Sequence, residues 1–529
     1  MSRLIQGGSL CSYGIDTLMK RILTAIVLAA LTLNEVSAQV AYPFSDVEYA
    51  VEMSGTLTNG DYAPFWLSSN KYGLSSVEEK TGYLRVGVFR PVETDSEYLW
   101  RIGYGADIAI PVNHTSPFVV QQLYADFEYK KVRLSIGSKE RGMELKNALL
   151  STGGQTTGIN ARPVPQIRIE LPEYWTIPHT GGWLAVKGHL AYGVFTDNSW
   201  QKDFITSASK QKYTSDVLYH SKAGYLRIGN DEISPLSFTG GLEMKTQFGG
   251  KMWNVGRRLD DTSDFSGNYV KGDTGFRGFL NAFVPGGSDA RDGDYKNVEG
   301  NHLGSWVFSL DYQGKGWSVR SYLDHFFDDH SQMFVQYGWK DLLLGLEAQL
   351  PDNPLVTNIV VEYLNTKDQT GPLYHDGTST LPDQISGRDD YFNHAMYTGW
   401  QHWGQSMGNP LIISPLYNSS TEIRFEHNRV IGHHIALAGT PTDEWSYRLM
   451  YTHVKSWGTY LLPLIDTRQA DFFFAELGYS PHWLKGWNAK VAFGTNSGNL
   501  LGKSSGATIS IVKRGFFTKK TTDCNCNMQ

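Results

Sequence analysis

The segment Gly404-Gln405-Ser406-Met407-Gly408 matches the G-x-S-x-G pattern of serine hydrolases, so it is the first candidate for catalysis. That pattern works when the serine stands on a sharp turn between a strand and a helix, within reach of a histidine. Pro410 and Pro415 follow closely, and no helical pattern begins there. The sequence therefore predicts a turn and no catalytic residue. A hydrolase in which Ser406 meets His402 is the enzymatic alternative.

Acidic and imidazole side chains gather at Asp324-His325 and Asp328-Asp329-His330, a combination that can hold a divalent cation. Clusters of this kind at strand ends are more often solvated loops, and we expect a loop here. Cysteine offers no alternative metal site, because Cys11, Cys524 and Cys526 lie outside the body of the chain. Neither a metal nor another cofactor is therefore expected.

A third kind of chemistry, the recognition of sugars, uses aromatic faces against C–H surfaces and planar polar groups against hydroxyls. The densest group of such side chains lies between residues 389 and 403, and a second joins Arg162 to Trp175. Asn160 and Arg162 stand in a stiff loop, since Pro163 and Pro165 fix an extended entry into the next strand. The candidate sugar contacts are Asn160, Arg162, Trp175, Asp389, Tyr391, Trp400, His402 and Trp403. Packing inside the protein, or at a membrane interface, is the alternative role for each of them.

These side chains must be positioned by strands, because the body of the sequence alternates with a period of two. From Tyr98 to Ile110 every second residue is apolar or aromatic, and Arg101 and Asp107 lie among the residues between. In a strand the two sets point to opposite faces. The alternation recurs at residues 123–130, 132–139, 184–194, 238–245, 305–312, 342–350, 359–363, 423–427, 445–453, 489–493 and 508–512.

Alternation alone also suits a soluble sandwich, but two features favour a membrane barrel. Aromatic residues gather towards the strand ends, as at Trp100, Tyr129 and Tyr312, and short turns alternate with long connections such as Asn254 to Asn301. Aromatic residues make up 13% of the chain, yet the mean hydropathy is −0.33, as expected for a barrel with a wet lumen. At about 25–30 residues per strand, we expect an all-β, transmembrane antiparallel barrel of roughly 16–20 strands with long extracellular loops.

The N-terminus predicts export. Lys20-Arg21 precedes an apolar run from Ile22 to Leu33, and Val36-Ser37-Ala38 ends in the small-residue pattern of a cleavage site. An uncleaved anchor is the alternative, although the run is shorter than the ~18–20 residues that a spanning helix needs. We therefore expect an N-terminal extension and signal peptide over residues 1–38, a barrel over 39–517 and a polar tail over 518–529. The net charge of −6, without a basic patch, argues against nucleic acid as a partner.

Three segments resemble the Wzi family of capsule-assembly proteins. The first runs from Leu149-Leu150-Ser151 to the Asn160-Ala161-Arg162-Pro163-Val164-Pro165 loop. The second contains Tyr391-Phe392-Asn393-His394 and ends at Met407-Gly408-Asn409-Pro410-Leu411. The third, Gly55 to Gly73 with Ala63-Pro64-Phe65-Trp66, is similar to the version of the family found in Gram-negative gut anaerobes. These motifs occur in the family's order and span most of the mature chain.

The resemblance implies a barrel of about eighteen strands in the outer membrane of a Gram-negative bacterium. It would bind capsular or exopolysaccharide and help to assemble or retain it at the cell surface, without catalysis. Outer-membrane lipid and lipopolysaccharide would surround it, and capsule export machinery is a further expected partner. Some members carry a small N-terminal helical bundle, of which Tyr49 to Leu74 shows no pattern. An outer-membrane porin or solute channel is the alternative function.

Overall fold

The computed structural model describes residues 46–95, 98–205, 211–229, 232, 234–255, 269–285, 299–328, 333–334, 338–351, 353, 355–375, 378–383 and 385–518. The expected signal peptide, the tail from residue 519 onward, and Asp329 and His330 of the acidic cluster lie outside the described residues. The expected division of the chain at residues 38 and 517 therefore stays a prediction.

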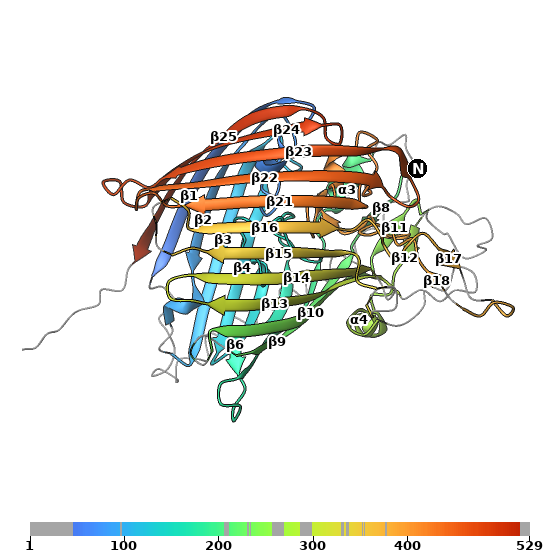
Figure 1. Ribbon diagram of the computed structural model, residues 1–529, viewed down its shortest axis with the longest axis horizontal. Helices are drawn as coiled ribbons and strands as arrows, with labels where there is room; N and C mark the ends of the chain where they lie inside the picture. The colour runs from blue at the N-terminus through green and yellow to red at the C-terminus, as the bar shows by residue number, and fades with distance from the viewer. Residues whose placement is uncertain are drawn as a thin grey trace, which may run out of the picture.

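Eighteen antiparallel strands form a closed barrel, which confirms the expected fold class (Figure 1). Each strand pairs with the next strand of the barrel in chain order, and β25 pairs with β1 from Val47 to Gly60, which closes the ring. The strands are β1 (Val47–Gly60), β2 (Lys80–Arg90), β3 (Trp100–Val112), β4 (Val119–Tyr129), β5 (Val132–Ser138), β6 (Gln166–Thr176), β7 (Leu184–Val194), β9 (Leu218–Ile228), β10 (Leu236–Phe248), β13 (Asn301–Gln313), β14 (Ser318–Asp328), β15 (Leu342–Gln349), β16 (Asn358–Asn365), β21 (Val430–Gly439), β22 (Trp445–Gly458), β23 (Pro463–Tyr479), β24 (Trp487–Gly498) and β25 (Ser504–Thr518).

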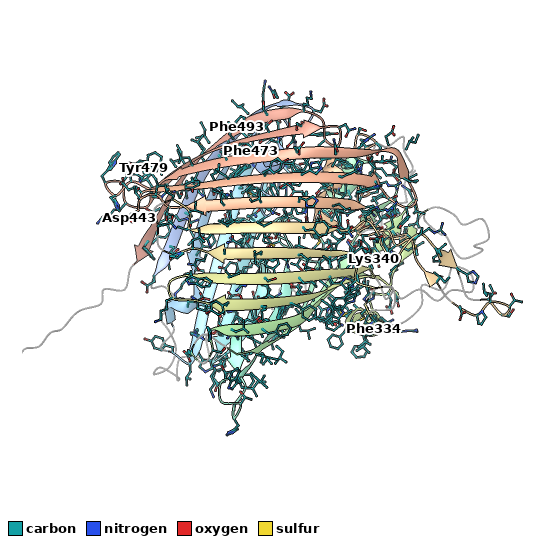
Figure 2. The ribbon with its side chains drawn as sticks, in the orientation of Figure 1. Phe334, Lys340, Asp443, Phe473, Tyr479 and Phe493 are labelled. Atoms are coloured by element: carbon teal, nitrogen blue, oxygen red, sulfur yellow. The ribbon has the colours of Figure 1, made fainter. Side chains whose placement is uncertain are left out.

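The period of two in the sequence becomes two faces of the wall. In β3, Ile108 and Ile110 are exposed on the outside, whereas Asp107 and Ala109 are buried on the inside. Phe473 and Phe493 likewise lie on the outer wall (Figure 2). An apolar outer face and a charged inner face are what a barrel needs when hydrocarbon surrounds it and polar groups fill it.

One predicted strand is wrong. Residues 423–427 alternate in hydrophobicity, but they belong to the connection between β16 and β21. Ile423 and Phe425 are buried in the interior of the barrel, so the alternation reflects packing in the lumen and not a lipid-facing strand.

The two ends of the barrel differ as the sequence predicts. The N-terminus of β1 and the C-terminus of β25 share one end, where short turns such as 130–131, 314–317 and 440–444 also lie. Long connections gather at the other end: residues 61–79, 139–165, 195–217, 249–300 and 366–429. In outer-membrane barrels the short turns face the periplasm and the long loops face outward, so these ends are called the periplasmic and extracellular ends.

Aromatic pairs lie at the periplasmic end of the wall. Trp100 lies 4.4 Å from Tyr129, and Trp445 lies 4.5 Å from Tyr479, measured between ring centroids. Such rings mark the level where hydrocarbon gives way to headgroups. The helices α2 (Phe65–Ser68), α3 (Asn198–Phe204) and α4 (Phe276–Phe283) are short, and no described helix is long and apolar enough to cross a membrane.

A charge on the lipid face tests the outward assignment. Leu346 is an exposed outward residue in the middle of β15, so Leu346→Arg should reduce the free energy of unfolding by about 2–4 kcal/mol. Leu461→Arg is the control, because Leu461 is exposed at the extracellular turn between β22 and β23 and should lose little. Urea unfolding in lipid vesicles measures the free energy of unfolding of both variants. Equal decreases in the two variants would contradict the assignment of Leu346 to the lipid face.

Candidate functional site

Three connections from the extracellular end fold back into the lumen, and we call them the plug: residues 61–79, 139–165 and 388–429. They form one buried apolar cluster with the inner wall. Phe65 of the first connection stacks on Phe472 of β23 at 4.3 Å, and its backbone amide donates to Asn496 of β24 at 3.0 Å. The plug thus occupies the space that would be a channel in an open barrel.

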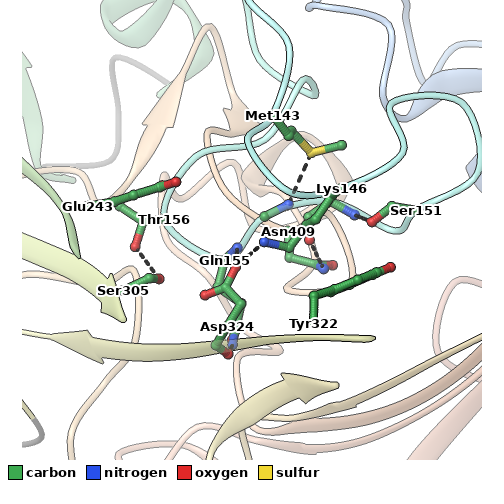
Figure 3. Close-up of polar contacts among 12 residues, drawn as sticks. Met143, Lys146, Ser151, Gln155, Thr156, Glu243, Ser305, Tyr322, Asp324 and Asn409 are labelled. Carbon is green, nitrogen blue, oxygen red and sulfur yellow. Dashed lines mark hydrogen bonds and ion pairs between the residues drawn. The ribbon is translucent and has the colours of Figure 1, made fainter. Parts of the chain in front are cut away.

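Two inward carboxylates of the wall hold the second connection, and Figure 3 shows one of them, Asp324. Asp324 of β14 forms an ion pair with Lys146 at 2.9 Å and accepts the backbone amide of Gln155 at 3.0 Å. Glu362 of β16 accepts from the Ser151 hydroxyl at 2.5 Å and from the Thr152 amide at 2.7 Å. Because both carboxylates are buried, removing either one leaves polar plug groups without a partner.

Asn160 joins all three plug connections. Its side-chain oxygen accepts the amide of Asn70 at 2.9 Å, and its amide nitrogen donates to the Ser406 carbonyl at 3.1 Å. Asn409 makes a second link, donating to the Thr152 hydroxyl at 3.0 Å and to the Gly153 carbonyl at 2.9 Å. Asn160, which the sequence predicts as a sugar contact, is buried, and its hydrogen bonds link the three connections of the plug.

Arg162, His402 and Trp403 are brought together at the extracellular side of the plug. The Arg162 guanidinium lies 4.1 Å from the Trp403 ring centroid and donates to the Thr115 hydroxyl at 2.9 Å. Its Nε has no hydrogen-bond partner among the described residues, and burial lowers the Arg162 pKa to about 10. The His402 ring lies under this pair: Nδ1 donates to the Arg162 carbonyl at 2.9 Å, because Nε2 accepts the Thr196 amide at 3.3 Å.

Trp400, Tyr391 and Asp389 belong to the body of the plug. Trp400 is fully buried and donates to the Thr156 carbonyl at 2.9 Å, and the Tyr391 hydroxyl donates to Asp341 at 3.1 Å. Asp389 is half-buried, and its amide donates to the Gln369 carbonyl at 3.2 Å. Packing in the lumen accounts for the burial of Trp400 and Tyr391.

Trp175 lies elsewhere, so the structure does not bring it to Arg162. Arg162 precedes the extracellular start of β6, whereas Trp175 is at the periplasmic end of that strand, opposite Val186 of β7. Its side chain is exposed at the level of the periplasmic aromatic pairs. The eleven residues of β6 run through the barrel wall, which separates two residues that are close in the sequence.

Ser406 has a structural environment. It lies on a hairpin formed by β19 (Gln401–His402) and β20 (Gln405–Ser406), whose turn residues Trp403 and Gly404 have positive φ. The Ser406 hydroxyl points to the Asn409 carbonyl at 3.4 Å, and the ring nitrogens of His402 are engaged with Arg162 and Thr196. The predicted turn is confirmed, and this geometry does not pair Ser406 with a base.

The acidic cluster is divided by the wall. Asp324 points inward to Lys146, whereas His325 lies on the outer face and stacks on Trp339 at 4.6 Å. Within the described residues, no group of three or more His, Cys, Asp and Glu side chains is arranged to hold a metal ion.

An aromatic row that sequence reasoning missed lies at the extracellular end. A small sheet consists of β8 (Tyr213–Ser215), β11 (Lys251–Trp253) and β12 (Tyr269–Lys271) (Figure 1). Tyr213, Trp253 and Tyr269 are directly opposite one another across it. The Tyr213 and Trp253 rings stack at 5.6 Å with an interplanar angle of 1°, and the Trp253 and Tyr269 rings lie 4.7 Å apart. All three are half-buried.

The opposite face of this sheet packs on the plug. Thr214 and Met252 are buried there, and Val270 contacts the same apolar cluster. Because side chains alternate between the two faces of a strand, Lys251 and Lys271 lie on the same face as the aromatic row. Ser215, the cross-strand partner of Lys251 on β8, lies on that face too. A row of rings therefore lies beside two lysines, of which Lys251 is 3.4 Å from Asp216.

Polar cavities remain between the plug and the periplasmic end. One of about 1040 Å³ lies between plug residues Asn70 and Lys71 and the periplasmic turn at Pro481 and His482. Others measure about 570 and 320 Å³. The lumen therefore has polar space on the periplasmic side, and the plug fills it on the extracellular side.

Comparison with known proteins supports the fold. No protein-family model matches the sequence, and no curated protein matches it. Among solved structures, the chain is similar to Wzi of Escherichia coli, an outer-membrane protein involved in group 1 capsule assembly and described as a carbohydrate-binding β-barrel. The identity is 13%, the TM-score is 0.52, and the similarity covers 92% of this chain and 87% of that chain.

Two further structures are less similar. OpdQ of Pseudomonas aeruginosa has a TM-score of 0.43 at 10% identity, with 90% of this chain and all of that chain covered. OmpT, an outer membrane protein of Vibrio cholerae, has a TM-score of 0.35 at 7% identity, with coverages of 89% and 97%. The likeness to Wzi shows the fold of an outer-membrane β-barrel, and the apolar outer wall agrees with that fold.

Removing a plug anchor should open the barrel. In a planar bilayer the native protein should conduct no more than the lipid baseline, and Asp324→Ala should produce discrete conductance steps, because it leaves Lys146 buried without its partner. Asp311→Ala is the matched control: Asp311 pairs with Arg320 of the wall and does not contact the plug in the described hydrogen bonds. Large steps from the native protein would contradict a closed lumen.

Acid should loosen the plug. Burial lowers the pKa of His394 to about 3 and that of His402 below its usual 6.5, and their acceptor nitrogens receive backbone amides. Histidines whose folded pKa is lowered contribute stability above pH 6.5 and lose it as the pH falls towards the lowered value.

Conductance should therefore be absent at pH 7 and present at about pH 4.5. The double variant His394→Gln/His402→Gln should weaken this dependence on pH. An unchanged response in that variant would assign the effect to other groups.

Proposed function

We propose that this barrel binds capsular or exopolysaccharide at its extracellular mouth and helps to hold it at the cell surface, without catalysis. The observation that carries the proposal is the row of Tyr213, Trp253 and Tyr269, set beside lysines on a sheet that rests on the plug. A binding surface outside and a filled lumen inside suit retention better than transport.

The row has the chemistry of a sugar platform. Aromatic faces cover the C–H surfaces of pyranose rings, and consecutive rings can contact consecutive sugars of a polymer. The Trp253 ring is fixed by a neighbour on the same face of the sheet, because its Nε1 donates to the Ser215 hydroxyl at 3.0 Å. A fixed ring loses little conformational entropy on binding, which increases its contribution to affinity.

The lysines favour an acidic polymer. Lys251 and Lys271 lie next to the ring row, so a sugar stacked on Trp253 or Tyr269 would place its substituents near an ammonium group. Carboxylate or phosphate substituents would then gain a charge-assisted hydrogen bond. Each contact is weak, but a polymer that engages many copies of the protein is held by their sum.

Two further observations support the binding function. The solved structure with the highest overall similarity among those compared above, that of Wzi, is described as a carbohydrate-binding barrel of capsule assembly. Trp403, half-buried and lying over the buried Arg162 guanidinium, offers a second aromatic contact on the plug. The rival function, a porin or solute channel, needs an open path that the plug fills, and the environment of Ser406 and His402 favours a role without hydrolysis.

Substitution of the row tests the proposal. Trp253→Ala/Tyr269→Ala should weaken binding of the purified barrel to the strain's own surface polysaccharide by about tenfold or more, at about 1 kcal/mol for each ring. Trp100→Ala/Tyr129→Ala is the matched control, because that pair is exposed at the periplasmic end. Equal binding by the native protein and the Trp253/Tyr269 variant would reject the row as the site.

Cells test the retention role directly. Deleting the gene should move polymer from the cell surface to the medium while total synthesis continues, and the Trp253/Tyr269 variant should fail to restore retention. An unchanged amount of cell-bound polymer in the deletion strain would refute the function as a whole.

A further inference from the structure

The outer wall of β9, β10 and β13 changes character towards its extracellular end. Near the periplasmic end its outward residues are apolar and exposed, as for Ile228, Phe238 and Leu310. Continuing along the same faces, the outward positions become Lys222 and a cross-strand row of His220, Thr246 and His302. A membrane-facing wall with these side chains would place imidazole, hydroxyl and ammonium groups against lipid, which is costly.

Helix α4 covers this polar patch. The Lys222 ammonium donates to the Phe283 carbonyl at the C-terminus of the helix, and the Thr246 hydroxyl donates to the Ala282 carbonyl at 3.3 Å. The Tyr192 hydroxyl donates to the Phe279 carbonyl at 3.0 Å. His220, Thr246 and His302 are buried as a result.

The face of α4 that turns away from the wall is apolar. Phe276 is 80% exposed, Leu280 50%, Phe283 39% and Val284, just after the helix, 62%. Their spacing forms one stripe along the helix, whereas the buried residues are the small Gly278 and Ala282. A helix on a water-soluble protein has the opposite arrangement, with its apolar side inward.

We propose that α4 is an interfacial helix whose exposed stripe contacts the acyl chains of the outer leaflet. The stripe continues the apolar belt of the wall that Leu226, Ile228, Phe238 and Leu310 begin. Figure 1 shows α4 end-on beside the ends of β10 and β13, so its axis runs across the strands, as expected for a helix that lies along the membrane plane. The helix supplies the lipid-facing surface that the polar wall lacks.

The position of α4 in the chain gives this contact a consequence. One connection, residues 249–300, carries β11, β12 and α4, and Lys271 of β12 is followed after four residues by Phe276. The Gly272 amide donates to the Gly250 carbonyl at 3.0 Å, so β12 is tied to β11 at the end from which the four-residue link leads to the helix. Lipid contact at α4 therefore fixes the height of the small sheet above the membrane.

Spin labels report whether lipid or water surrounds the stripe. The protein in lipid vesicles carries Leu280→Cys, with Cys11→Ser, Cys524→Ser and Cys526→Ser to leave one labelling site. The label at Leu280 should be several-fold more accessible to oxygen, which partitions into hydrocarbon, than to a water-soluble nickel chelate. Leu310→Cys on the lipid-facing wall is the positive reference, and Leu373→Cys in an exposed extracellular loop is the aqueous one.

Two results would overturn the assignment. A label at Leu280 that behaves like the one at Leu373 places the stripe in water, and a label shielded from both reagents places it under another protein or a second copy. Val284→Cys gives an independent position outside the helix if the Leu280 variant does not fold. Neither result depends on polysaccharide, so the outcome is separate from that of the binding experiments.

Discussion

A chain that passes through hydrocarbon must pair every backbone amide and carbonyl within itself, and the rest of this structure depends on that constraint. The register of β25 against β1, over fourteen residues of β1 from Val47 to Gly60, removes the two edges that a sheet would otherwise leave. Closure with eighteen strands makes a ring wider than side chains from the wall alone can fill. Such a ring either conducts or is filled by the chain's own connections.

Buried charge is the means by which this chain fills it. The inner wall presents carboxylates, and Asp324 and Glu362 hold the plug through Lys146, Gln155, Ser151 and Thr152. An ion pair of this kind stabilises little by itself, because desolvation offsets the attraction, but breaking it leaves an uncompensated charge. The anchors therefore specify one position of the plug, while stacking such as Phe65 on Phe472 supplies apolar contact.

The fold followed from the sequence because the period of two is a direct consequence of a membrane wall. Long strands such as β3 repeat the pattern often enough to be recognised, and only packing inside the barrel, at Ile423 and Phe425, imitated it.

The residues of the candidate site were harder to predict from the sequence than the strands. The Asn160 to Pro165 loop and the segment around Trp400 were recognised, and the structure places both in the plug. The aromatic row was missed because β8, β11 and β12 have three residues each, too few to display alternation. Tyr213, Trp253 and Tyr269 are also far apart in the chain, and only their pairing unites them.

Helix α4 escaped sequence reasoning for a related reason, since eight residues make little more than two turns. The orientation of its apolar face can be understood only from the polar groups of the wall that the helix covers. A hydrophobic stripe alone would predict a helix packed with Phe276 and Leu280 inward, yet the polar groups at Lys222 and Thr246 reverse it. The wall can carry polar outward side chains at this place because α4 covers them and presents its own apolar side chains to the lipid. The same connection carries β11 and β12 of the sheet that bears the aromatic row before it reaches α4, so one stretch of chain contributes both to the binding surface and to the surface that meets lipid. The sheet is thus positioned twice, by its packing on the plug and by the short link from β12 to the helix that meets lipid.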